Sequence, residues 1–74
     1  MEPELLDVLN EAVKTKQRKE ELERSIGRAL RRRNMDFNVY VQIMSELRDT
    51  AARDNLSLDD AAKKLLSQDK KGEQ

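Results

Sequence analysis

Few side chains in this sequence are suited to covalent chemistry. The chain of 74 residues contains no histidine and no cysteine, so the usual general base and the usual strong nucleophile are both missing. Its serines and threonines therefore have no histidine to activate them. Structural zinc sites are built mainly from the same two residue types. We therefore predict a protein that is not an enzyme and has no cofactor, no metal and no small-molecule substrate.

Asp59 and Asp60 come closest to a paired carboxylate site. Ser57 stands three residues before Asp60, in the arrangement of a capping box, and no calcium-loop spacing surrounds the pair. Two acids in a first helical turn are stabilised by the positive end of the helix dipole. We expect Asp59 and Asp60 to begin a helix and not to hold an ion.

Basic side chains are concentrated in one part of the chain. Residues 14–33 carry nine bases and three acids, although the whole chain has 15 of each. At 100° per residue, four arginines fall opposite the apolar side of this segment: Arg24, Arg28, Arg31 and Arg32. Guanidinium groups suit carboxylates or phosphates. Two interpretations stay open: a solvated helix face that pairs with nearby acids, or a contact for an anion or for duplex nucleic acid.

The spacing of apolar residues predicts an all-α fold. Pro3 and the neighbouring acids mark a helix start. Apolar side chains then recur at steps of three and four residues, which predicts one long helix over about 4–33, a rod of roughly 45 Å. The centre of this apolar seam is charged, with Lys16, Lys19 and Glu23, so we expect loose packing there.

Two further helices follow, and together they define the predicted architecture. Asn34 and Asp36 predict a C-cap and an N-cap, so a second helix covers about 37–53; Ser57 predicts a third over about 58–67. We expect the long helix to pack antiparallel against these two as a helical hairpin or three-helix bundle. The predicted domain covers 1–68, and 69–74 is predicted to be a disordered tail.

Residues 36–41 also alternate between apolar and polar, as in a short strand. This stretch, followed by helical segments at 43–54 and 56–62, resembles the ribbon-helix-helix repressors over about half the chain. The resemblance implies a dimer whose paired strands enter the major groove. By that resemblance Asn38, Tyr40 and Gln42 would face bases, and Ser57 would lie near phosphate.

The apolar content favours association. Only 36% of residues are apolar, 41% are charged, and ordering a chain costs roughly 1.5 kcal/mol per residue, which leaves little net stability for a lone monomer. The predicted partner interface is an N-terminal apolar patch: Leu5, Leu6, Leu9, Ala12 and Val13. With no cysteine and no long apolar run, we expect a cytoplasmic protein that makes no membrane contact.

We therefore predict a small regulatory or adaptor protein that acts by helix-mediated protein–protein interaction, as a homodimer. The alternative is a DNA-binding transcriptional regulator that uses the strand at 36–41 or the arginine stripe. Single-stranded nucleic acid is not expected, because Phe37 and Tyr40 are the only aromatic residues and both are predicted to be core.

Overall fold

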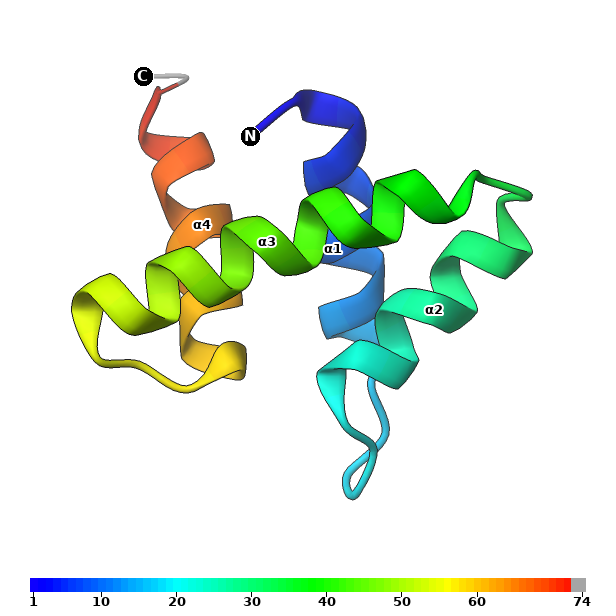
Figure 1. Ribbon diagram of the computed structural model, residues 1–74, viewed down its shortest axis with the longest axis horizontal. Coiled ribbons are helices and arrows are strands. Elements are labelled where there is room, and N and C mark those ends of the chain that lie inside the picture. Colours follow the sequence, from blue (N-terminus) through cyan, green and yellow to red (C-terminus); the bar gives the residue numbers. More distant parts are fainter. Residues whose placement is uncertain (73–74) are drawn as a thin grey trace.

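The computed structural model describes the backbone of residues 1–72 and the side chains of residues 1–68. This part of the chain is all-helical, as predicted. The four helices are α1 (Pro3–Thr15), α2 (Leu22–Arg32), α3 (Phe37–Asp54) and α4 (Leu58–Gly72). α1 and α2 form a hairpin, α3 crosses α1, and α4 turns back to lie against α1 and α3 (Figure 1).

The long helix predicted over about 4–33 is wrong. The chain leaves the helix at Lys16, which is extended, and returns to it only after Glu21. A continuous helix would have kept charged side chains on the apolar seam, whereas the turn lets Leu22 and Ile26 fold back into the core against α1. The longest dimension of the molecule is 29 Å, so the expected 45 Å rod and the bundle of three helices do not form.

Two hydrogen bonds between Gln17 and Glu20 close the α1–α2 turn. The Glu20 N–H donates to the Gln17 carbonyl oxygen at 3.1 Å. In return, the Gln17 N–H donates to the Glu20 Oε1 atom, also at 3.1 Å. These reciprocal bonds satisfy polar groups of a turn that contains neither glycine nor proline.

The α2–α3 connection follows the predicted caps. Asn34 adopts a left-handed conformation with φ 55°, and the Met35 N–H donates to the Leu30 carbonyl oxygen at 3.0 Å. The Asp36 carboxylate then accepts a bond from the Asn38 N–H at 3.1 Å. Because this cap starts α3 at Phe37, residues 37–41 are helical, and the alternative strand at 36–41 is wrong.

The α3–α4 connection also forms where the sequence predicted it. Asn55 is left-handed with φ 56°, and the Leu56 N–H donates to the Ala51 carbonyl oxygen at 2.8 Å. Ser57 Oγ accepts a bond from the Asp60 N–H at 3.1 Å. α4 continues to Gly72, past its expected end at about 67, so the predicted tail at 69–74 is helical through 72, and residues 73–74 lie outside the described part of the chain.

One apolar core joins all four helices. Leu9, Ile26, Ile43 and Leu47 have no more than 2% of their surface exposed, and Ala61 and Ala62 of α4 complete the same cluster. α1 and α3 each contact all three of the other helices. Within the described residues, no helix is both long enough and apolar enough to cross a membrane.

Candidate functional site

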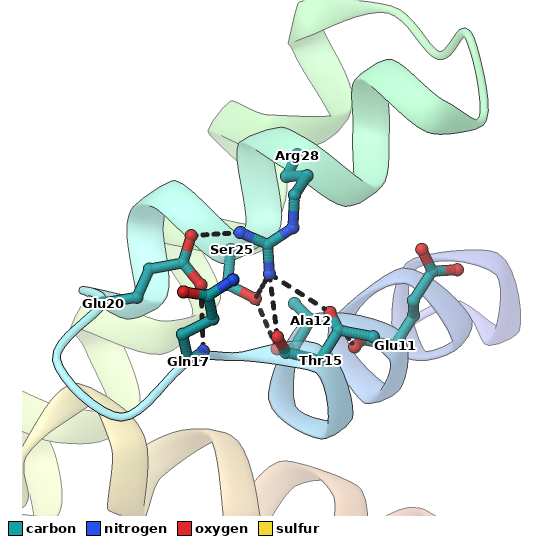
Figure 2. Close-up of polar contacts among 7 residues, drawn as sticks. All are labelled: Glu11, Ala12, Thr15, Gln17, Glu20, Ser25 and Arg28. Atoms are coloured by element: carbon teal, nitrogen blue, oxygen red, sulfur yellow. Dashed lines mark hydrogen bonds and ion pairs between the residues drawn. The ribbon is translucent and has the colours of Figure 1, made fainter.

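Arg28 links α2 to the end of α1 and to the turn, on the solvent-exposed side of the α1–α2 hairpin. Figure 2 shows its guanidinium directed toward the end of α1, where it donates to the Thr15 carbonyl oxygen at 2.9 Å. The same group forms an ion pair with the Glu20 carboxylate. The hydrogen bond from Arg28, assisted by the Gln17 N–H, lowers the pKa of Glu20. Arg28 therefore holds a helix end and the turn together.

Ser25 links the same two helices through a buried hydrogen bond. Its side chain is fully buried between α1 and α2, and its hydroxyl donates to the Ala12 carbonyl oxygen (Figure 2). A small residue lets the two helices approach, and the hydrogen bond removes the cost of burying its polar atom. Ser25 and Arg28 therefore hold the two helices together, in addition to the Gln17–Glu20 bonds within the turn.

Glu11 joins α1 to the last turn of α2. Its carboxylate accepts from Arg32 Nε at 2.7 Å and from Arg33 Nε at 3.0 Å, and both arginines also form ion pairs with it. These contacts, led by the hydrogen bond from Arg32, lower the pKa of Glu11 to about 2. Glu11 therefore stays ionised far below the usual range of a carboxyl group.

The predicted arginine stripe is divided by these contacts. Arg28 and Arg32 are engaged by acids of the same hairpin. Arg24 and Arg31 are exposed, enter none of the ion pairs among the described residues, and line a groove that also borders Tyr40. Half of the stripe therefore stabilises the fold, and only the other half faces solvent.

None of the ion pairs among the described residues joins an acid of α3 to the basic segment at 14–33. Asp54 instead pairs with Lys64 of α4 and, at 3.8 Å, with Arg53 beside it. The hydrogen bond from Lys64 lowers the pKa of Asp54. The break in the long helix explains the change, because it brings Glu11 and not the α3 acids within reach of the arginines of α2.

The N-terminal apolar patch is enclosed by the chain itself. Leu9 and Ala12 are fully buried, Leu5 and Leu6 are 6% and 7% exposed, and Val13 packs against the same core. A sequence cannot show whether an apolar helix face meets its own chain or a partner. As folded here, these side chains offer almost no surface to a second protein.

Two apolar residues of α3 are exposed instead. Phe37 is 69% exposed, although it was predicted to belong to the core, and Val41 is 49% exposed. The Phe37 ring stacks on Tyr40 with the ring centroids 5.3 Å apart. Val41 lines a groove with Met1 and Leu5. We call the surface formed by Met1, Phe37 and Val41 the α3 face.

A second exposed feature missed by the helical interpretation is the set of cations in the α1–α2 turn. Lys16, Arg18 and Lys19 were placed inside a long helix, but the structure puts them on a turn. Lys16 and Arg18 line a groove together with Asp59 and Lys63 of α4. The charged centre of the predicted seam was the one available signal that the helix would break here.

The two acids considered as a paired carboxylate site, Asp59 and Asp60, begin a helix instead, as expected. Asp59 and Asp60 lie in the first turn of α4, and the Asp60 N–H is capped by Ser57. Among the described residues, no three metal-ligating side chains come together to hold an ion. The arrangement as a whole presents an exposed apolar face and a basic turn.

Comparison with known proteins adds no family: no protein-family model, no curated protein and no solved structure matches this chain.

Proposed function

We propose that this protein is a small non-enzymatic regulator or adaptor that acts by helix-mediated contact with a second protein. The contact surface is the α3 face, and the first partner is a second copy of the chain. The exposure of Phe37 is the observation that carries this proposal, because a large aromatic side chain lies 69% exposed in a chain with only two aromatic residues.

Burial of the α3 face is energetically useful. Removing a side chain such as Phe37 from water contributes about 1.5–3 kcal/mol, and Val41 adds to this one helical turn away. The stacking of Phe37 on Tyr40 restricts the ring before a partner arrives, which reduces the entropy lost on docking. Aromatic anchors of this kind commonly dominate the energy of protein interfaces.

The shape of the α3 face suits a symmetric dimer. The groove beside Val41 lies between α3 and the first residues of α1, and one turn of α3 separates it from Phe37. In an isologous dimer each copy uses the same surface, so Phe37 of one copy can enter the groove of the other. Glu2 and Glu46 at the groove provide a polar rim.

Light scattering coupled to size-exclusion chromatography, run over a range of concentrations, tests this proposal. We expect the wild-type protein to move from monomer to dimer as its concentration rises, and Phe37→Ser to remain monomeric because its anchor is lost. Asp49→Ser changes an exposed residue of the same helix outside the α3 face and should dimerise like the wild type.

Circular dichroism of Phe37→Ser should match the wild type, since the ring is outside the core. A wild-type protein that stays monomeric at every concentration would contradict the homodimer. Equal association of wild type and Phe37→Ser would show that the contact lies elsewhere.

A further inference from the structure

We propose that the α1–α2 turn and the adjoining part of α4 bind the phosphate backbone of duplex nucleic acid. The surface consists of five cations, which we call the basic turn surface: Lys14, Lys16, Arg18, Lys19 and Lys63. It takes the place of the arginine stripe expected from the sequence. This inference does not depend on the α3 face, because the two surfaces share no residue.

The fold brings these cations together from three elements. Lys14 lies in the last turn of α1, Lys16, Arg18 and Lys19 belong to the turn, and Lys63 comes from α4. Lys63 lines one groove with Lys16 and Arg18, and a second groove with Lys14. A long helix would have spread the first four cations around its circumference, whereas the turn places Arg18 beside Lys19 in one groove and beside Lys16 and Lys63 in another.

The positive charge of this surface is not cancelled by the chain. None of the five cations enters the ion pairs formed among the described residues. Glu20 lies within the turn, but its carboxylate is occupied by Arg28 and by the Gln17 N–H. The other acids nearby include Glu21, Asp59 and Asp7, and five cations against these three leave a positive excess. A local excess of this kind attracts polyanions even when net charge is zero.

The turn presents its cations on a fixed backbone. Arg28 ties the turn to the Thr15 carbonyl oxygen, and the Gln17–Glu20 bonds close the loop (Figure 2). Arg18 and Lys19 are exposed at the outer side of this closed loop. Because the backbone is already ordered, binding need not restrict it further, which favours affinity.

Because the five cations are spread over a surface, they favour a long ligand with regularly spaced negative charges. They are exposed or half-buried and do not enclose a pocket for one small anion, whereas a nucleic-acid backbone offers phosphates at every step. Phe37 and Tyr40 stack on each other, and neither lines the two grooves of the basic turn surface. Without base stacking, the double-stranded form is favoured.

Protein and membrane partners fit this surface less well. Among residues 1–68, the large exposed apolar side chains are Met1, Phe37 and Val41, and none of them lines the grooves of the basic turn surface. The apolar side chains that do line these grooves are buried or half-buried: Leu6, Val13 and Leu66. Protein interfaces commonly have an apolar centre, and helices that lie on membranes bury an apolar face. A backbone-directed contact with duplex needs neither.

Fluorescence anisotropy with a short duplex of mixed sequence, titrated at several salt concentrations, tests the proposal. We expect the wild-type protein to bind at low salt and to weaken steeply as salt rises. The double variant Arg18→Gln with Lys19→Gln should bind about tenfold more weakly and should flatten the salt slope by about 2, since each phosphate contact contributes close to 1. Lys63→Gln should flatten it by about 1.

The matched control is the double variant Arg31→Gln with Arg48→Gln. It removes two exposed cations outside the basic turn surface, so its net charge equals that of the first variant. We expect its salt slope to stay at the wild-type value. An equal loss in both double variants, or no duplex binding by the wild type at low salt, would overturn the proposal. Vesicles containing phosphatidylserine should bind more weakly than duplex, and equal or tighter binding to them would also overturn it.

Discussion

The two hairpins of this protein are closed in different ways. The α3–α4 connection uses local signals: a left-handed Asn55 and the Ser57 cap. The α1–α2 connection has no such signal, and Glu21 at the start of α2 makes no side-chain capping bond. Besides the bonds between Gln17 and Glu20 within its loop, it is held by residues far apart in the chain, with Ser25 bonded to Ala12 and Arg28 bonded to Thr15. A turn can therefore be imposed by tertiary contacts where the local sequence favours a continuous helix.

The largest loss of stability is expected when the buried hydrogen bond between α1 and α2 is removed. Ser25→Val deletes the bond to Ala12 and forces a larger side chain into a site with no exposed surface. Lost hydrogen bonding and overpacking together should lower the free energy of unfolding by about 2–4 kcal/mol. Urea titration followed by circular dichroism measures this change.

Ser67→Val is the matched control for that experiment, because Ser67 is exposed on α4 and lies outside the groove beside Val41. It should change the free energy of unfolding by less than about 0.5 kcal/mol. If Ser25→Val and Ser67→Val were equally stable, the proposed role of the Ser25–Ala12 bond in holding the hairpin would be refuted.

A smaller loss of stability is expected when the Ser57 cap of the α3–α4 connection is removed. Ser57→Ala removes the acceptor of the Asp60 N–H at the start of α4. Loss of an N-cap of this type should cost about 1 kcal/mol. The same urea titration measures it, and Ser67→Ala, an exposed position later in α4, serves as control. A cost as large as that of Ser25→Val would mean that the two hairpins do not differ as described.

The smallest effect concerns the ion pairs of Glu11, since Arg32 is largely exposed to solvent. The pKa of Glu11 is lowered from its usual 4.5 to about 2 in the folded protein. Stabilisation by a carboxyl group with a lowered pKa is complete above the unfolded value and is lost as pH falls from about 4.5 toward 2. Glu11→Gln should therefore have a lower Tm than the wild type at pH 7, and the two Tm values should converge near pH 2.

Glu4→Gln, at an exposed acid of the same helix, is the control for Glu11→Gln. Thermal melts at several pH values provide the measurement. A Tm difference between Glu11→Gln and wild type that is unchanged from pH 7 to pH 2 would show that Arg32 and Arg33 do not stabilise the charged form.

The fold was predictable where short-range chemistry decides it. Asn34, Asp36 and Ser57 predicted the ends and starts of helices, and the structure has them within a residue or two. The break at 16–21 was not predictable from propensity, because the segment contains no glycine or proline. Its cause is the burial of Leu22 and Ile26 against α1, a long-range gain that spacing along one helix does not reveal.

The candidate surfaces were less predictable than the fold. Apolar periodicity assigned Phe37 to the core, yet its ring lies 69% exposed in the first turn of α3, stacked on Tyr40. Charge counting located the basic segment correctly but could not separate Arg28 and Arg32, which pair with acids of the hairpin, from Arg18 and Lys19, which do not. That distinction depends on which acids the turn brings within reach.

Docking through the α3 face is tested most directly by amide NMR spectra recorded over a range of protein concentrations. We predict that resonances of residues 37–46 and of the first residues of the chain shift or broaden as concentration rises, while those of the α1–α2 turn stay constant. Spectra that do not change with concentration, or changes confined to the turn, would contradict the proposed interface.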